Sequence, residues 1–322
     1  MAITRYLKIG EESEYAVEAT SYPDALDPET VDLDSEDDDK LIYEGISGLD
    51  RVAGLGVYST AGSITVPLDD KIAPWFWKWT LGGYEVTGDS TTSFTHIFSP
   101  VTGGTLTSFS AKVGKDIMEH IFLGNVIESL ELEVESEWAL MTVNTLGAKD
   151  KKGTLSDQVD FNEGNIFTAP MVSLSKDGSD ISPQIRSMTF SLETGADIES
   201  SQGFGSRFPT QAFSGSMVAS AELTLSFENV DQLITFWGDQ DAPSEDTIQE
   251  TSYTINFGDS FDISMPRVVY TASNQPVEGR DSVEQTVTAR ALYDDTNKEG
   301  PVVVSVTNDK DSYSVSTGGT TT

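Results

Sequence analysis

The side chains that most often carry out catalysis are scarce in this chain. Its 322 residues include two histidines, His96 and His120, and no cysteine, which excludes thiolate catalysis and cysteine-ligated zinc. Both histidines lie in strand-like stretches and are expected to be structural. The stretch "GLGVYSTAG" (54–62) has a Gly-x-Gly but lacks the later glycine spacing of a phosphate-binding loop. We therefore expect no enzyme, no catalytic residue and no cofactor.

Carboxylates are the abundant functional groups, with 53 acidic against 19 basic residues. Close acid pairs then arise by chance and do not indicate general acid–base catalysis. The densest run, "DLDSEDDDK" (32–40), resembles a cation-binding loop, but it lacks the glycine at its sixth position and the glutamate at the twelfth that an EF-hand requires. A solvated loop is the default expectation, loose binding of Na⁺ or Mg²⁺ stays open, and we assign no metal site.

One acidic stretch has the spacing of a strand. "ESLELEVESE" (128–137) alternates apolar and acidic residues, and successive side chains of a strand point to opposite faces. The apolar residues are expected to face a core, whereas the other face carries four carboxylates: Glu131, Glu133, Glu135 and Glu137. Carboxylates in a row repel one another and any acidic neighbouring strand.

The overall charge limits the class of protein. A formal net charge of −34 works against a compact state at ordinary ionic strength, but salt near 1 M shortens the Debye length to about 3 Å. The composition is therefore typical of a protein from a salt-loving source, and an acidic mesophilic protein is the alternative. The same charge excludes DNA recognition through basic patches. The first ten residues have no apolar segment and no stretch is long enough to span a membrane, so we expect a soluble protein made in the cytoplasm.

Strand signals dominate the chain, and two stretches have helical spacing. They are "PLDDKIAPWFWKWTLGG" (67–83) and "ENVDQLITFWGD" (228–239), each with an acidic or Asn cap and a terminal glycine. Their apolar residues are expected to pack the helices onto a sheet: Trp75, Phe76 and Trp79 in the first, and Leu233 and Trp237 in the second.

The two helices lie in matching contexts, which predicts an internal duplication. "GSITVPLDDKIAPWFW" and "AELTLSFENVDQLITFW" each read as a strand, a cap and a helix with Phe-Trp, and more strands follow both. A rival match pairs "FLGNVIESLELEVESE" with "FSGSMVASAELTLSFE", but only the first keeps the helices in step. The expected fold is mainly β, with two tandem β-sandwich or barrel domains, each with one short flanking helix. The boundaries are an acidic N-terminal arm at 1–40, domains at 41–155 and 168–297, a linker at 156–167, and a C-terminal arm at 298–322.

The order of several motifs resembles a known family. "EGISGLDRVAGLGVYSTAGSITVPLDDKIAPWFWKWTLGG" is followed by "FTHIFSP", "LTSFSAKVG" and "IFLGNVIESLELEVESEWALMTVNTLG". Together these stretches resemble the tail tube (major tail) protein of a long-tailed double-stranded-DNA virus. The likeness covers about residues 10 to 150 well and extends to the second half through the duplicated layout. The acidity suggests a virus that infects a halophilic archaeon.

The resemblance implies a structural protein of the virion tail. Subunits of that family join their strands around a lumen, and the rings stack into a tube that conducts viral DNA without binding it specifically. Two tube domains per chain favour a ring of three chains with pseudo-sixfold symmetry over a hexamer. The expected partners are other copies of the chain and other tail proteins, and no membrane. The segments 1–40 and after Gly300 are the candidates for tying one ring to the next.

Candidate lumen-lining residues follow from the two copies. In the first copy they are Glu131, Glu133, Glu135 and Glu137. In "SVEQTVTARAL" of the second copy, taken as the counterpart strand, they are Glu284, Thr286 and Thr288. A lumen coated with carboxylates would repel phosphates. The alternative is that the acidic row belongs to the outer surface, and we favour the lumen.

Three other functions compete with a tail tube. A tail terminator or baseplate hub would share the tube fold. A cell-surface β-sandwich protein of a halophile would share the acidity, but it would carry a signal peptide. A polysaccharide-binding module or hydrolase would place its tryptophans on loops, whereas four of the five tryptophans fall in the expected helices.

Overall fold

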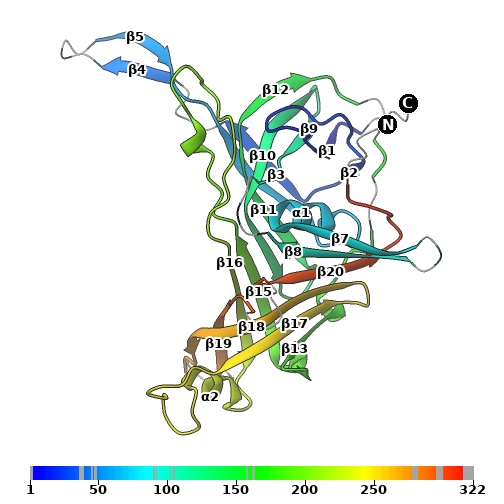
Figure 1. The fold of residues 1–322 in the computed structure, drawn as a ribbon, viewed down its shortest axis with the longest axis vertical. Helices are drawn as coiled ribbons and strands as arrows, with labels where there is room; N and C mark the ends of the chain where they lie inside the picture. The colour runs from blue at the N-terminus through cyan, green and yellow to red at the C-terminus, as the bar shows by residue number, and fades with distance from the viewer. Residues whose placement is uncertain are drawn as a thin grey trace.

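The computed structural model is mainly β with two short α-helices, as the sequence predicts (Figure 1). It describes residues 3–314 with internal gaps. The gaps are 36–39, 45, 47, 48, 90, 92, 102, 104, 105, 157, 158, 162, 163, 278–281 and 295–299.

The elements fall into two series along the chain. The first contains β1 (Arg5–Glu11), β2 (Asp24–Leu26), β3 (Thr30–Ser35), β4 (Lys40–Glu44), β5 (Asp50–Leu55), β6 (Thr60–Pro67), α1 (Ala73–Leu81), β7 (Gly82–Asp89), β8 (Ser93–Pro100), β9 (Phe109–Lys115), β10 (Met118–Val134), β11 (Leu140–Gly147) and β12 (Lys149–Gly153). The second contains β13 (Val172–Lys176), β14 (Ser179–Asp180), β15 (Ile185–Glu193), β16 (Val218–Ser226), α2 (Asp231–Trp237), β17 (Glu250–Phe257), β18 (Phe261–Asn274), β19 (Glu284–Ala291) and β20 (Val303–Asn308). Three short 3-10 helices, Ala169–Met171, Ser182–Gln184 and Glu199–Ser201, lie in the second half.

The central element is a sheet of eight antiparallel strands, which we call the large sheet. Its order is β3-β6-β11-β10-β15-β16-β19-β18. Two further sheets pack against it. One has the order β2-β1-β9-β10-β12, and the other β14-β13-β17-β18-β20-β8-β7. The long strands β10 and β18 each belong to the large sheet and to one of the others, so all three sheets share one hydrogen-bonded network.

The same order of pairing occurs in both halves of the chain. In the first half, β3 pairs with β6, β6 with β11, and β11 with β10, whose other half pairs with β9 and β12. In the second half, β15, β16, β19, β18, β17 and β20 take these places in the same order. The helices α1 and α2 follow β6 and β16, which are equivalent strands. The hairpins β4–β5 and β7–β8 have no counterpart among the strands of the second half.

The register also matches between the halves. A bulge interrupts β10 between Ile127 and Ser129 and interrupts β18 between Tyr270 and Ala272. Each residue of β10 is therefore equivalent to the residue of β18 whose number is higher by 143. A row across the first four strands runs through Val126, Leu146, Ala61 and Asp34. The equivalent row across the second four strands runs through Val269, Arg290, Ser220 and Ser191.

The segments expected to be terminal arms contribute strands instead. The described part of 1–40 forms β1, β2 and β3, and Leu7 and Ile9 of β1 belong to the core. The described part of 298–322 includes β20 and Tyr313, which is buried against Trp75. Apolar residues alternate in both segments, which favours strands. The prediction of arms was based on the charged residues that flank these short apolar stretches. Residues 36–39 of the acidic run and the C-terminal "STGGTTT" lie outside the described residues.

Helix α1 packs with its aromatic side chains against the core. Trp75, Phe76 and Trp79 are all buried, and the Trp79 ring stacks on Phe109 with 4.4 Å between ring centroids. The Asp69 carboxylate accepts hydrogen bonds from the backbone N–H groups of residues 72 and 73, at 2.6 and 2.9 Å, and so caps the helix start.

Helix α2 packs differently from the prediction. Leu233 and Trp237 are only half-buried, whereas Gln232 and Thr235 are buried. The reason is a buried cation on β13, because the Lys176 ammonium donates to Gln232 Oε1 at 2.9 Å and to Thr235 Oγ1 at 2.7 Å. Helix α2 therefore turns its polar side inward and leaves an apolar side partly exposed.

Candidate functional site

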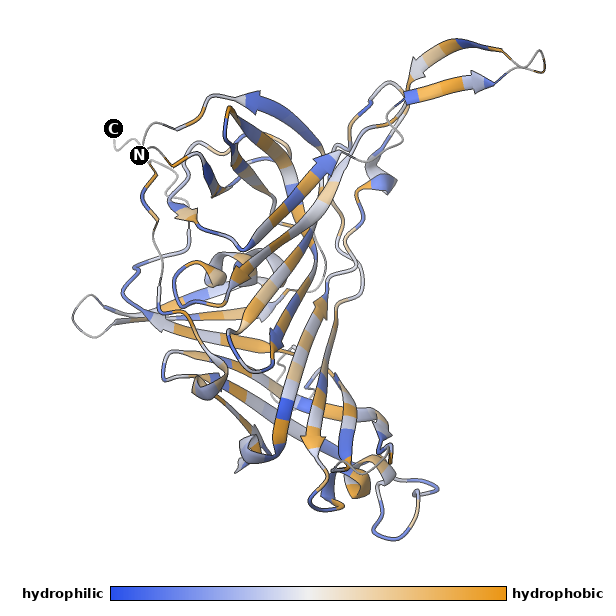
Figure 2. Cartoon of the chain, turned by 180° about the vertical axis from the view of Figure 1, so that it is seen from behind, coloured by the Kyte–Doolittle hydropathy of each residue, from blue (hydrophilic) through white to orange (hydrophobic). Residues whose placement is uncertain are grey.

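The large sheet has one apolar and one polar face, and its strands alternate accordingly (Figure 2). The apolar face contributes to the core: Leu33, Ile64, Leu130, Leu132, Met141, Val143, Phe190, Leu192, Leu223 and Val287 are all buried. We call the opposite side the polar face. Among its side chains are Thr30, Asp32, Asp34, Ser63, Thr65, Ser129, Glu131, Glu133, Thr142, Asn144, Thr189, Ser191, Glu193, Ser220, Glu222, Thr224, Glu284, Thr286, Thr288, Arg290 and Asn274.

Small polar groups on this face hydrogen-bond across the strands. The hydroxyl groups of Thr65 and Thr142 lie 3.0 Å apart, and Asn144 Nδ2 donates to Ser129 Oγ at 2.8 Å. Such cross-strand pairs contribute to the stability of the sheet. The polar face is thus a surface of hydroxyl and amide groups on which the charged side chains are spaced apart.

The cross-strand neighbours of the glutamates on β10 are uncharged, which limits the repulsion between carboxylates that the sequence pattern suggests. Glu131 lies directly between Thr142 and Ser191, and Glu133 lies between Leu140 and Thr189. Neither glutamate therefore faces another charge on an adjacent strand, and both are exposed to solvent. Apart from the exposed bulge residues Glu128 and Arg186, the described strand positions of the face carry seven carboxylates against the guanidinium of Arg290. The carboxylates are those of Asp32, Asp34, Glu131, Glu133, Glu193, Glu222 and Glu284.

Two of the predicted acidic positions leave the sheet. Strand β10 ends at Val134, so Glu135 and Glu137 lie in the turn that leads to β11. The turn is fixed by the connector between the two series of strands, because the Glu137 carbonyl accepts a hydrogen bond from Ala169 N at 2.8 Å. The expected row of four glutamates is therefore a pair on the polar face and a pair beyond its border.

The predicted residues of the second half do share the face. Thr288 lies opposite Glu222, which lies opposite Thr189, the neighbour of Glu133. Glu284 and Thr286 follow on the same side of β19. The strand equivalence differs from the expected one, however, because β19 holds the place of β11, and the place of β10 belongs to β18. The face also carries four acids that are not among the predicted residues: Asp32, Asp34, Glu193 and Glu222. The alternation in "MTFSLE" and "SAELTLS" points to the last two.

Both edges of the large sheet are open within the part of the chain that the structure describes. At one edge β3 pairs with β6 alone. At the other edge, residues 270–274 of β18 pair with β19 on one side only. Unpaired edges present rows of backbone donors and acceptors that another strand can join.

A third exposed feature is the hairpin of β4 and β5, which projects away from the sheets (Figure 1). All its described strand residues are exposed. Many are large and apolar: Leu41, Ile42, Tyr43, Leu49, Val52 and Leu55 are each at least 59% exposed. An isolated two-stranded hairpin is marginally stable in water, so this one needs another surface to cover it.

The histidines are held in structural contacts. His96 is buried, with Nδ1 2.9 Å from the Tyr84 hydroxyl and Nε2 3.0 Å from Asn308 Oδ1, and burial lowers its pKa. His120 Nε2 contacts the carboxylate of Asp150 on β12. The described side chains include no cluster of three or more His, Asp or Glu placed to hold a metal ion. None of the helices within the described ranges is long and apolar enough to cross a membrane.

Comparison with known proteins identifies the family. No curated protein matches the chain. The family described as phage tail tube protein matches residues 4–291, which include every strand from β1 to β19. This protein belongs to the phage tail tube protein family and is a structural component of the virion tail.

Proposed function

We propose that three copies of this chain close into a ring, and that the rings stack into the tube through which viral DNA leaves the virion. The observation that carries the proposal is the large sheet, with one buried face, one polar face and two open edges. Such a sheet is suited to continue from chain to chain around a closed barrel, which removes its edges.

Each chain supplies two tube domains in this proposal. The repeated pairing order and the matching bulges in β10 and β18 support an internal duplication. The domains then extend over β1–β12 and β13–β20, so the strands of both terminal segments belong to them. Three chains provide six such units with pseudo-sixfold symmetry.

The junction inside the chain is the template for the junction between chains. Within one chain, β10 of the first unit pairs with β15 of the second, with Glu131 opposite Ser191. The equivalent strands are β18 and β3. In the proposed ring, β18 of one chain therefore pairs with β3 of the next, with Asn274 opposite Asp34.

The size of the barrel favours three chains over six. With strands ~4.8 Å apart and tilted by ~40°, three large sheets close into a barrel ~48 Å across at the backbone. Six chains would double that diameter. Side chains occupy part of the width, and the remaining lumen of the smaller barrel suits a single DNA duplex.

The polar face lines the lumen in this arrangement, since the opposite face is buried in the core. Its carboxylates repel the phosphates of DNA, and its hydroxyl and amide groups are spread too evenly to read a base sequence. Affinity for DNA comes mainly from cations that displace counterions. A face on which carboxylates far outnumber guanidinium groups therefore lets DNA pass without holding it.

The β4–β5 hairpin ties one ring to the next. Its exposed apolar residues would be covered by the neighbouring ring, which supplies the contact that the isolated hairpin lacks. This role replaces the one first expected for the terminal segments.

Electron microscopy of the purified protein at high and low salt tests the proposal. Stacked rings with a central hole are the expected result, and class averages should have three chains around the axis. Monodisperse monomers at every salt and protein concentration would overturn it, and six chains in a ring would replace the trimer with a hexamer.

A further inference from the structure

Two equivalent strands in the two halves have different surroundings. β20 pairs on one side with β18 and on the other with β8, so both its edges are used. β12 holds the same place in the first half, yet among the described residues it pairs only with β10. Its outer edge is the position that β8 occupies on β20.

The two strands also differ in chemistry. β20 has the sequence VVSVTN, and its Val304 and Val306 are buried. β12 has the sequence KDKKG, in which Lys151 and Lys152 are exposed. Asp150 of β12 is already bound by His120 and by the Tyr58 hydroxyl. The edge of β12 is therefore cationic, whereas the edge of β20 is apolar and covered.

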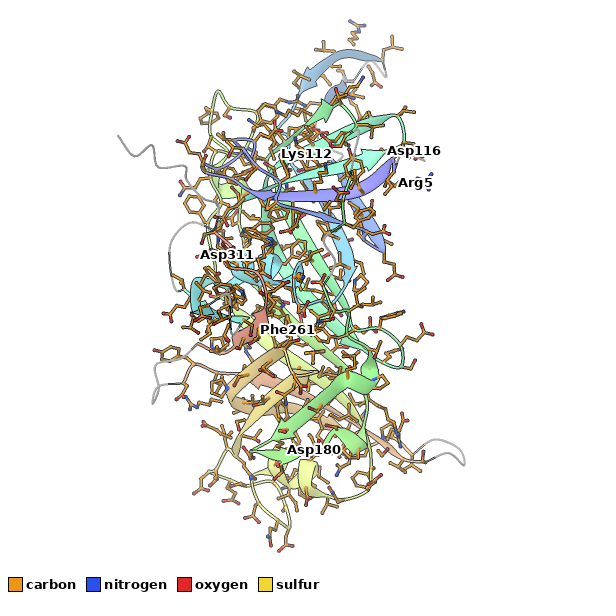
Figure 3. All side chains as sticks on the ribbon, turned by 90° about the vertical axis from the view of Figure 1, so that its right-hand side faces the viewer. Arg5, Lys112, Asp116, Asp180, Phe261 and Asp311 are labelled. Carbon is orange, nitrogen blue, oxygen red and sulfur yellow. The ribbon has the colours of Figure 1, made fainter. Side chains whose placement is uncertain are left out.

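This charge is part of a wider concentration of cations. Seven of the 19 basic residues lie on β1, β9 and β12, which belong to the same sheet with β10 between β9 and β12: Arg5, Lys8, Lys112, Lys115, Lys149, Lys151 and Lys152. Figure 3 shows Arg5 and Lys112 at the same end of the molecule, far from Asp180. The equivalent strands β13, β17 and β20 contain a single basic residue, Lys176. Three of these cations are paired within the chain, Arg5 with Asp116 and both Lys112 and Lys151 with Glu18. Lys149 and Lys152 of β12 form no ion pair among the described residues, so in a chain of net charge −34 they are the cations that an acidic partner could meet.

The segment that would meet β12 is identified by the repeat. The strand that covers β20 comes from the connection after α1, residues 82–108, which contains β7 and β8. The equivalent connection after α2 is residues 238–249, which we call the acidic loop. It is too short to form a hairpin like β7–β8, and it carries four exposed carboxylates and no cation: Asp239, Asp241, Glu245 and Asp246.

Helix α2, which precedes the acidic loop, also has an exposed apolar surface that a neighbouring chain could cover. Trp77 of α1 is buried where the two halves meet, with its ring 5.9 Å from Phe190 and 6.3 Å from Phe261. The Phe-Trp pair recurs in α2 as Phe236 and Trp237, and there both side chains are partly exposed. The apolar contact that Trp77 makes inside the chain is therefore left unmade by its equivalent.

We propose that the acidic loop of one chain docks on the cationic edge of β12 of the next chain, with Trp237 packed beside it. The partner is a second copy of this chain, and the contact rests on the proposed ring. Opposite charges at this one junction offset the general repulsion between highly acidic chains, and they also fix which edges meet.

Charge reversal on each side tests the contact. Lys149→Glu with Lys152→Glu changes β12 and leaves Lys151 bound to Glu18. Asp241→Lys with Glu245→Lys changes the loop and spares Asp239 and Asp246, which hydrogen-bond within it. Light scattering at a series of concentrations measures ring assembly, and thermal unfolding checks that each variant is folded. Each pair alone should raise the concentration for half-assembly by about tenfold, and all four changes together should restore it.

The loop variant separates a specific contact from general repulsion. It makes the chain less negative, from −34 to −30, so general repulsion alone would strengthen assembly, whereas the proposed contact requires that assembly weaken. Stronger assembly of the loop variant, or unchanged assembly of both variants, would overturn the inference while leaving the ring intact. If the wild-type protein forms no rings at all, the proposed function itself fails.

Discussion

A pair of cysteines can test the junction between chains directly. The natural chain has none, so Asp34→Cys together with Asn274→Cys introduces a single possible pair. The two positions come from the register inside the chain, where Glu131 lies opposite Ser191. Asn274 is the equivalent of Glu131 in β18, and Asp34 is the equivalent of Ser191 in β3.

The geometry of that pairing sets the expected result. Residues directly opposite each other in an antiparallel pair have Cα atoms ~4.5–5.5 Å apart, which lies within the ~4.4–6.8 Å span of a disulfide. Mild oxidation of assembled protein should therefore give covalent dimers and trimers on a non-reducing gel. A ring of three chains limits the ladder to the trimer, whereas a ring of six would extend it to the hexamer.

Two matched controls make the test specific. Glu131→Cys with Ser191→Cys recreates the same contact inside one chain and should cross-link without any change in molecular mass. Asp34→Cys with Ser273→Cys moves one cysteine by a single residue, which turns its side chain to the other face of the strand. Equal ladders from the two Asp34 pairs would refute the proposed register, as would rings in the microscope that give no ladder.

Three other outcomes can be measured. Ile42→Asp in the hairpin should shorten the stacks seen by electron microscopy and leave the thermal midpoint of the single chain unchanged, because this side chain is 60% exposed. Trp77→Ala should lower the free energy of unfolding by ~3–5 kcal/mol in denaturant titrations, the usual cost of truncating a buried large aromatic side chain, while Trp237→Ala should cost the isolated chain much less. His96→Gln should reduce the loss of stability between pH 7 and 5.5. Burial lowers the pKa of His96, so its contribution is complete above the unfolded value of ~6.5 and falls as acid protonates the ring.

Much of the fold could be predicted from local patterns. Alternation predicts the strands, and the spacing of Trp75 and Trp79 with the Asp69 cap predicts α1. The orientation of helix α2 could not be predicted from local patterns. The side of α2 that faces inward is determined by Lys176, which lies on a strand 55 residues or more earlier in the chain. The sequence of the helix itself gives no indication of that partner.

The candidate site was predicted in part for a similar reason. Glu131, Glu133, Glu284, Thr286 and Thr288 follow from period-two alternation and do share one face. The end of β10 could not be predicted, because the contact of Glu137 with the connector at Ala169 determines it. Pairing between distant segments also decides that the other acids of the face come from β3, β15 and β16.

The two kinds of junction in the proposed ring answer different needs. The junction inside a chain is formed once, during folding, so it can use apolar groups such as Trp77 and the covered edge of β20 without ever exposing them. The junction between chains must stay open until assembly. An apolar edge there would promote aggregation of the free chain, whereas the lysines of β12 and the carboxylates of the acidic loop remain soluble apart and attract each other when aligned. A duplicated chain thus halves the number of such open junctions in each ring and leaves charge to control the rest.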